Sequence, residues 1–389
     1  MEVKQVYSLV NDATKEILGD SVILAEDLTN VVDVGTALFR PSSVDRYVKS
    51  LVDHIGKVIF VNRPYSGGAP SVMMDGWEYG AVLQKISTTL PEASENETWE
   101  LEDGASYDQN IFYKPNVQNK FYNKYTTFEI ARSITEKQVK GSFSSAEQLN
   151  GFVSMLYTAV ENALTVKTDA LIMRTINSMI GDTIYADYAG SAMSGATSGV
   201  KAINLLYLYN TRYNLSLTAA NAISDPAFIR FASYVIGLTA DRMTKMSKLY
   251  NVGGAERFTP ADRRHIVLLS DFASAAGAFL ESDTYHNEFV KWPNAETVPY
   301  WQGSGTDYGF SSVSAVKITT GSGNSIDATG ILGVIFDRDA LGVCKLDQRV
   351  TTHYNAKAEF FNNYYKFDAG YFNDLNENFV VFGVQDNVI

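Results

Sequence analysis

The stretch SAEQLNGFVSMLYTAVENALTVKTDALIMRTINSMIG, residues 145–181, carries the strongest structural signal in the sequence. Ser144 and Ser145 are candidate N-caps, and Glu147 and Gln148 are placed as capping-box partners. Gly181 is expected to end the helix. The apolar residues of the stretch recur with a helical period, and they are Leu149, Phe152, Val153, Leu156, Val160, Ala163, Leu164, Leu171 and Ile172.

The pattern predicts a helix over residues 145–180, roughly 50 Å long at about 1.5 Å per residue. This is several times the usual length of about 11–12 residues. One apolar stripe of such length indicates a spine against which a sheet packs. A coiled-coil strand is the alternative, but the regularity at heptad positions a and d is poor.

The end of the chain predicts a series of strands, because short β-branched or aromatic segments alternate with turns. These segments are SSVSAVKITT (311–320), GILGVIFDRD (330–339), LGVCKLDQRVTTHYNA (341–356), EFFNNYYKFDAGYFN (359–373) and ENFVVFGV (377–384). Together with the spine, they predict an α+β protein.

The middle of the chain predicts a small α/β unit. RRHIVLLS (263–270) is an apolar strand that leads directly into a helix capped by Ser270 or Asp271. A second helix is expected to begin at Asp225-Pro226, which combine N-cap and N1 chemistry. The other expected elements are helices over 3–17 and 42–55, a strand over 57–62 and a Gly- and Ser-rich flexible connector over 186–200.

Residues 71–135 predict a long two-stranded excursion from the body. Its outer part is acidic, with no Lys or Arg between Lys85 and Lys114, whereas the return arm (111–134) is aromatic and basic. One interpretation is a solvated hairpin whose opposite charges balance each other. The other is an arm that lies across a neighbouring subunit, because a protrusion this long has little core of its own.

Composition narrows the classes of function. The chain has 389 residues, is 46% hydrophobic and carries a net charge of −12. Its length predicts two or three domains, or one core with large insertions, and its hydrophobic fraction excludes global disorder. The acidic balance argues against general nucleic-acid affinity, which needs Lys and Arg to displace phosphate counterions. It suits a surface that stays near DNA without binding it.

The compartment is expected to be a reducing cytoplasm. The single cysteine, Cys344, excludes an intramolecular disulfide framework and a cysteine-rich zinc module. No apolar run approaches 18 residues, so neither a transmembrane helix nor a membrane partner is expected. The first residues are charged, so no signal peptide is expected. The 23 tyrosines and 21 phenylalanines suit large contact surfaces as well as a core.

Motifs for catalysis or cofactor binding are missing from the sequence. It has no phosphate-binding loop of the form G-x-x-x-x-G-K-[ST], no G-x-S-x-G elbow and no EF-hand loop. No two of its four histidines are within four residues of each other, which excludes a local zinc pair. Cys344 lies in an apolar strand and is expected to behave as a small hydrophobic residue. We therefore expect no enzyme activity, no catalytic residue, no cofactor and no metal.

Three stretches carry a family resemblance. NVVDVGTALFRPSSVDRYVKSLVDHIGKVIFVNRP (30–64) is similar to the N-terminal region of phi-29-like and related phage coat proteins. Residues 330–384 are similar to the closing coat-family strands, and HIVLLSDFASAAGAFL (265–280) resembles the strand-to-helix step of the family's axial domain. With the order of elements, the chain resembles the major capsid proteins of tailed bacteriophages, which have the HK-97-type coat fold.

The resemblance implies a division of the chain and a set of partners. Residues 1–65 would be an N-terminal arm and 66–135 an extended loop. Residues 136–184 and 330–389 would form a peripheral domain with the spine helix, and 185–329 a mixed α/β axial domain. Hexamers and pentamers would build an icosahedral shell, the virion capsid, around double-stranded DNA in the host bacterial cytoplasm. Scaffold, portal and decoration proteins would be separate partners, and packaged DNA a non-specific content.

Aromatic residues of the excursion are our predicted anchors between subunits. They are Trp77, Tyr79, Trp99, Phe112, Tyr113, Phe121 and Tyr122. Two rival functions remain open at this point. One is another virion component, such as a tail or decoration protein, and the other is an α/β enzyme with an active site in the 185–329 lobe. The long spine helix disfavours the first rival, and no motif supports the second.

Overall fold

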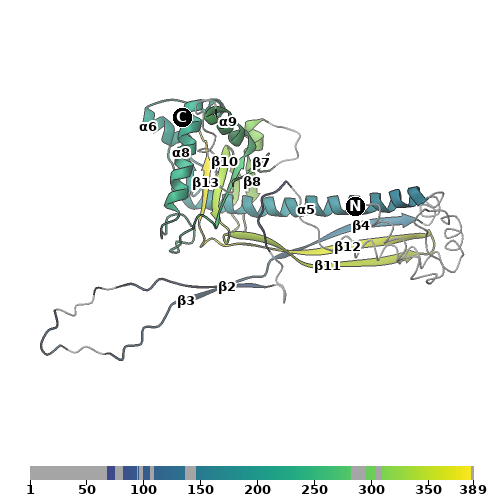
Figure 1. Ribbon diagram of the computed structural model, residues 1–389, viewed down its shortest axis with the longest axis horizontal. Helices are drawn as coiled ribbons and strands as arrows, with labels where there is room; N and C mark the ends of the chain where they lie inside the picture. The colour runs from purple at the N-terminus through teal and green to yellow at the C-terminus, as the bar shows by residue number, and fades with distance from the viewer. Residues whose placement is uncertain are drawn as a thin grey trace.

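The computed structural model describes residues 68–74, 82–93, 95, 100–105, 109–135, 146–281, 295–302 and 309–386. A long helix lies along a narrow sheet, a lobe of sheet and helices stands at one end of this helix, and a thin hairpin projects outward (Figure 1). The elements predicted over 3–17, 42–55 and 57–62 lie outside the described residues. No helix in the described ranges is long and apolar enough to cross a membrane.

The long helix is α5, Ala146–Tyr188, which runs unbroken for 43 residues or about 65 Å. Between Leu171 and Ile184 it is buried on nearly every side. Its buried threonines donate their hydroxyl groups to the carbonyl oxygens four residues earlier, so these polar groups are satisfied inside the core. The predicted spine is confirmed.

The predicted end of the helix at Gly181 is wrong, because α5 continues to Tyr188. The glycine permits close packing instead. A Cβ atom at Gly181 would lie 2.6 Å from Thr320 Cγ2 and 3.1 Å from Ile326 Cγ1. Both neighbours belong to the small hairpin of β8 (Val316–Thr319) and β9 (Ser325–Ala328), including its turn. Contact with this hairpin, rather than helix termination, explains the glycine.

We expect Gly181→Ala to lower the free energy of unfolding by about 1–2 kcal/mol, because the new methyl group overfills the contact. Gly237→Ala is the matched control. Gly237 lies within another helix, and no atom is found within 4 Å of the position that its Cβ would occupy, so alanine there should raise stability by up to about 1 kcal/mol. Chemical denaturation measures both variants. Stabilisation by Gly181→Ala would contradict the packing explanation.

The narrow sheet has the strand order β1-β11-β12-β4. Its strands are β1 (Met73–Met74), β4 (Tyr125–Thr135), β11 (Leu341–Asn355) and β12 (Phe360–Asn373). Burial alternates along most of β12, because one of its faces packs against α5. On that face the rings of Phe128 and Phe367 stack with their centroids 4.9 Å apart.

The lobe is built on a second sheet with the order β5-β13-β10-β6-β7. Its strands are β5 (Ala202–Asn204), β6 (Arg264–Leu269), β7 (Ala295–Val298), β10 (Ile331–Asp337) and β13 (Phe379–Gly383). Its helices are α6 (Leu205–Tyr213), α7 (Ala219–Ala222), α8 (Pro226–Arg242), α9 (Ser270–Glu281) and α10 (Phe310–Val313). Both sheet faces are covered, one by α5 and the other by α6, α8 and α9.

The double burial explains why these strands are continuously apolar. In β13, Phe379 and Val381 join the core around α5, whereas Val380 and Phe382 join the core under the lobe helices. The predicted strand-to-helix step at 263–270 is confirmed by β6 and α9. The predicted start at Asp225-Pro226 is confirmed as well, since Asp225 Oδ1 accepts hydrogen bonds from two backbone amides of α8.

The projecting hairpin is shorter than the excursion predicted over 71–135. It contains β2 (Leu83–Thr88) and β3 (Val117–Tyr122), which pair with each other and with no other strand of the described residues. Residues 125–135 form β4 instead, which pairs with β12 along its whole length. The connector expected over 186–200 begins after Tyr188. Asp187 fixes its far end by accepting hydrogen bonds from the Lys201 and Ala202 amides.

Candidate assembly surfaces

The hairpin has two different faces. Side chains alternate between the two faces of β2 and β3, and one face is turned toward the rest of the chain. The residues on this face are partly buried, and they are Leu83, Lys85, Lys120 and Tyr122. The opposite face is bare, and its apolar side chains are Ile86, 63% exposed, Val117, 57% exposed, and Phe121, 62% exposed. One face of the hairpin is therefore attached and the other is an unpartnered apolar surface.

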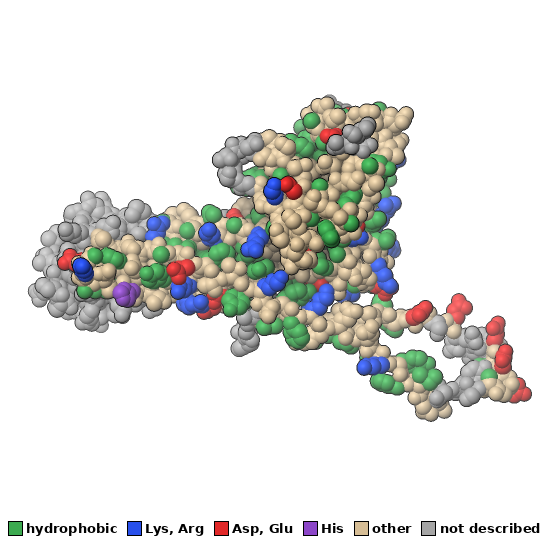
Figure 2. All heavy atoms as spheres, turned by 180° about the vertical axis from the view of Figure 1, so that it is seen from behind, with side chains coloured by type: hydrophobic (Ala, Val, Ile, Leu, Met, Phe, Trp, Pro, Cys, Tyr) green, Lys and Arg blue, Asp and Glu red, His purple; other side chains and the backbone are tan. Residues whose placement is uncertain are grey.

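The tip of the hairpin, residues 89–116, has no strand in its described part and is exposed throughout that part. Phe112 and Tyr113 are each 83% exposed, and Leu101 is 61% exposed. Figure 2 shows acidic side chains along the far end of the hairpin and hydrophobic side chains on one arm. A two-stranded hairpin on its own is only marginally stable in water. An exposed aromatic surface of this size is typical of a segment that packs against another molecule.

Ion pairs hold the attached face at the root of the hairpin. Lys85 Nζ lies 2.8 Å from Asp374 Oδ2 and 2.7 Å from Glu377 Oε1. Lys120 Nζ lies 3.0 Å from Asp374 Oδ1, and Arg257 Nε lies 3.3 Å from Glu377 Oε1. We call these five residues the root cluster. It joins the hairpin to the turn between β12 and β13.

Electrostatics make the root cluster stable near neutral pH. Burial alone disfavours the charged form of Asp374. The hydrogen bond and charge of Lys85, together with hydrogen bonds from the Asn376 backbone and from Lys120, outweigh burial and hold the pKa of Asp374 below its ordinary value. Burial likewise opposes the charged form of Lys85, but its two carboxylate partners raise the pKa of Lys85 above its ordinary value. Burial and the nearby Asp374 raise the pKa of Tyr122.

We expect Lys85→Met to weaken the attachment of the hairpin by about 2 kcal/mol, because a buried carboxylate loses a charged partner. Amide hydrogen exchange in β2 and β3 measures this loss. A carboxyl with a lowered pKa contributes stability above its ordinary pKa of about 4, and this is lost as pH falls through the lowered value. Wild-type protection should therefore fall on acidification below about pH 4, and the variant should show less of this dependence.

The control is Arg349→Met, which removes the ion pair between the solvent-exposed Arg349 and Asp368 and should leave exchange in the hairpin unchanged. Equal protection of β2 and β3 in wild type and Lys85→Met at pH 7 would show that the root cluster does not hold the hairpin.

The structure places the predicted anchors unevenly. Phe112, Tyr113 and Phe121 are exposed on the hairpin, while the ring of Tyr122 turns inward and lies 5.2 Å from that of Phe372 in the same chain. Trp77, Tyr79 and Trp99 lie outside the described residues. Contact with neighbouring subunits stays a prediction for all seven. Sequence reasoning missed Ile86 and Val117, which the alternation of β2 and β3 could have placed beside Phe121.

A Ser, His and Glu arrangement beside the lobe does not form a nucleophile with its base. Ser71 Oγ donates to Glu296 Oε1, and His265 Nε2 lies 2.8 Å from Glu296 Oε2. The carboxylate thus separates the imidazole from the hydroxyl group, the reverse of what nucleophile activation requires. Cys344 is buried in β11, as predicted, and burial raises its pKa to about 11, the opposite of an activated thiol.

Metal ligands are also not assembled. In the part of the chain that the structure describes, no three His, Cys, Asp or Glu side chains are grouped so that they could hold a metal ion. The features that the described residues do show are a long spine helix, a hairpin attached by ion pairs and a bare apolar face on that hairpin.

Comparison with known proteins identifies the family to which a chain with this architecture belongs. The family model for the Phi29-like phage major capsid protein matches residues 9–383. The chain belongs to this family. Among curated proteins, this Phi29-like chain is similar to the major capsid protein of Bacillus phage GA-1, with 22% identity over 169 residues, which is 41% of this chain and 33% of that protein. The aligned segment thus spans about a third of that relative's length.

The Phi29-like chain also shares its fold with solved phage structures. It is similar to a chain in the capsid structure of Staphylococcus phage Andhra, with a TM-score of 0.52, 10% identity, and coverage of 83% of this chain and 86% of that chain. A chain in the structure of head fiber and inner core protein gp22 of native bacteriophage P68 gives a TM-score of 0.51, 9% identity, and coverage of 83% and 87%. The resemblance to phage capsid proteins and the α+β fold class are confirmed.

Proposed function

We propose that this protein is the major shell subunit of a phage head, and that its copies assemble as hexamers and pentamers into an icosahedral capsid around double-stranded DNA. The observation that supports this most directly is the hairpin, which ion pairs attach on one face and which exposes Ile86, Val117 and Phe121 on the other. An arm that is rigid at its root and bare outside suits contact with a second copy. Family membership supports the same function.

Each part of the chain receives a role in this proposal. The 136–184 and 330–389 segments form a peripheral domain around the spine, and 185–329 forms the axial domain in an HK-97-type arrangement. The 66–135 segment acts as the extended loop over a neighbour, and 1–65 acts as an N-terminal arm. The exposed acid-rich tip and apolar outer face of the hairpin support the role of the loop.

Assembly energetics follow from many weak contacts. Apolar area buried at an interface contributes about 25 cal/mol per Å² before the costs of association are subtracted. A single arm therefore gives modest affinity, but a closed ring engages every arm at once and multiplies the effect. Aromatic side chains lose little conformational entropy on contact, so Phe112 and Tyr113 suit the role of anchors.

The proposal needs no cofactor and no catalysis. Separate scaffold, portal and decoration proteins act with the shell, and assembly takes place in the host bacterial cytoplasm. The net charge of −12 suits a lining along which DNA moves during packaging. Binding of the isolated subunit to duplex DNA is then expected to be weak at physiological salt, and tight binding would contradict this part.

Electron microscopy of the purified protein, with sedimentation analysis of the same sample, tests the proposal. We expect shells, tubes or free capsomers as the concentration is raised. A discrete small oligomer that turns over a substrate would favour the enzyme with a site in the 185–329 lobe. Fibres or thin spikes would favour another virion component. Either result would overturn the proposal.

A further inference from the structure

A groove of about 570 Å³ lies on the lobe between the end of α6 and the first half of α8. These two helices form the flank of the lobe that faces away from α5 (Figure 1). Large apolar side chains line the groove although they face solvent, since Tyr213 is 52% exposed and Leu215 is 49% exposed. Apolar surface left bare in a hollow is typical of a binding site.

Local hydrogen bonds fix both walls of the groove. Asn214 ends α6 in the left-handed conformation, and the Leu215 N–H donates to the Asn210 carbonyl. The side chain of Asn210 donates to the Leu217 carbonyl and accepts from the Leu217 N–H. At the other wall, Asp225 Oδ1 accepts from two backbone amides and caps α8. A groove held in this way can bind without rearrangement, which lowers the cost of association.

The charged residues that line the groove have one sign. They are Arg212 and Arg230, and both are exposed. The guanidinium carbon of Arg212 lies 5.7 Å from the ring centre of Tyr213 and 5.9 Å from that of Phe231. Within the described part of the chain, Arg212 is held by aromatic rings and has no carboxylate partner. A guanidinium that stacks on rings keeps the N–H donors of its edge, which bind a carboxylate as a fork.

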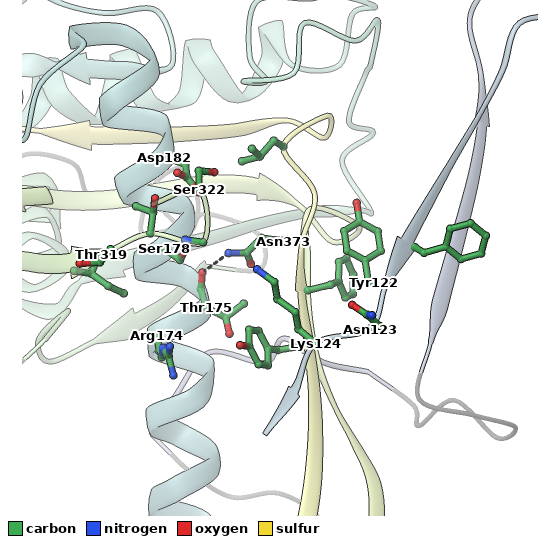
Figure 3. A pocket seen from close by; sticks show the side chains of 17 residues that line it. Tyr122, Asn123, Lys124, Arg174, Thr175, Ser178, Asp182, Thr319, Ser322 and Asn373 are labelled. Carbon is green, nitrogen blue, oxygen red and sulfur yellow. Dashed lines mark hydrogen bonds between the residues drawn. The ribbon is translucent and has the colours of Figure 1, made fainter. Parts of the chain in front are cut away.

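The cavity at the root of the hairpin differs in this respect. Its lining includes Asp182 as well as Lys124 and Arg174, and Asn373 Nδ2 donates to the Thr175 carbonyl there (Figure 3). Opposite charges and an internal hydrogen bond thus come from one chain. The groove on the lobe has bases without acids in its lining, in a protein whose net charge is −12. Its charge is therefore complementary to that of an acidic partner.

A short acidic peptide segment suits this groove better than a nucleic acid does. Affinity for a polyanion grows with the number of Lys and Arg residues that displace its counterions, and two arginines displace few. The net charge of −12 also repels the rest of a long polyanion. A peptide segment meets only the local charge, and an aromatic side chain on it can cover the bare apolar lining.

We propose that the groove between α6 and α8 is a docking site for a separate protein, which binds through a short segment with carboxylates on both sides of an aromatic side chain. Arg212 binds one carboxylate through its N–H fork, and Arg230 attracts the other. Leu215 and Phe231 receive the aromatic ring. This inference goes beyond the proposed function, because it concerns a partner other than a second copy.

Fluorescence anisotropy of a labelled peptide, DDEWDDL, titrated with the purified full chain, tests the site. We expect saturable binding. The peptide NNQWNNL lacks the carboxylates and DDEADDL lacks the ring, so each should bind about tenfold more weakly or worse. These comparisons do not depend on the folding of any protein variant. No binding of DDEWDDL, or equal binding of all three peptides, would overturn the inference.

Protein variants locate the binding. Arg212→Ala should weaken the binding of DDEWDDL about tenfold or more. Arg212→Lys should not restore it, because an ammonium group forms no planar fork. Arg349→Ala is the matched control, since it removes an exposed arginine from the narrow sheet and should leave binding unchanged. Equal weakening by Arg212→Ala and Arg349→Ala would indicate general attraction between charges and would contradict a site on the lobe.

Two other occupants have their own outcomes. A single-stranded DNA of about a dozen nucleotides that binds more tightly than DDEWDDL and is weakened by Arg212→Ala would assign the groove to nucleic acid instead. Loss of shell assembly in Arg212→Ala would make the groove a contact between copies. Either result would overturn the inference. If the wild type binds DDEWDDL as expected but forms no shells, tubes or capsomers, the proposed function is wrong while this inference stands.

Discussion

Replacement of Trp301 by alanine is expected to lower the free energy of unfolding by about 4 kcal/mol. Trp301 is 1% exposed in the core shared by α5 and both sheets. Its Nε1–H donates to the Ile331 carbonyl at 2.9 Å, its backbone N–H donates to the Val313 carbonyl at 3.0 Å, and its carbonyl accepts from Asn177 Nδ2 at 2.8 Å. The residue therefore links the spine, β10 and α10, and its removal leaves a large cavity among them.

The comparison with Trp301→Phe separates volume from hydrogen bonding. Phenylalanine retains most of the ring but loses the Nε1–H donor, which leaves the buried Ile331 carbonyl without that partner, so a loss of about 1–2 kcal/mol is expected. Chemical denaturation of the unassembled subunit measures both variants. A loss below about 1 kcal/mol for Trp301→Ala would show that the junction of spine and lobe is not the stabilising core described above.

The sequence predicted those elements whose signals are local. The apolar period of residues 149–172 predicted the spine, and the apolar runs around Val267 and Val381 predicted strands, which the structure buries on both faces. Gly181 misled the prediction because a glycine retained for close packing gives the same sequence signal as a glycine that ends a helix. The contact with Thr320 that distinguishes the two cases lies 139 residues away along the chain.

The attached and exposed faces of the hairpin could not be predicted from the sequence, because they are set by contacts between residues that are far apart along the chain. Lys85 and Asp374 are 289 residues apart, and their ion pair decides which face of the hairpin is attached. Residues 125–135, which form β4, were predicted to belong to the excursion, because alternating polar and apolar residues fit an edge strand or a central strand equally well. Only the pairing of β4 with β12 places it in the narrow sheet. The cavity at the root of the hairpin is enclosed by the end of β3, the middle of α5, the turn between β8 and β9 and the end of β12, so no local sequence pattern could have predicted it.

Combined replacement of Phe112 and Phe121 by alanine is expected to impair assembly while leaving the subunit folded. The two side chains are 83% and 62% exposed, so their truncation removes little of the subunit's own core. At an interface, a well-buried aromatic anchor contributes about 2 kcal/mol or more. Two such losses at every contact of a shell should raise the concentration needed for assembly by well over tenfold.

Light scattering against concentration, with electron microscopy of the products, measures the effect. Tyr234→Ala is a suitable control, because Tyr234 lies in α8 of the lobe and is 55% exposed. It should assemble near the wild-type concentration. Particles of normal yield and stability from the Phe112→Ala/Phe121→Ala protein would mean that the bare face of the hairpin does not form the contact. In that case its exposed aromatic residues would have no part in holding subunits together, and the attached hairpin would be a solvated limb.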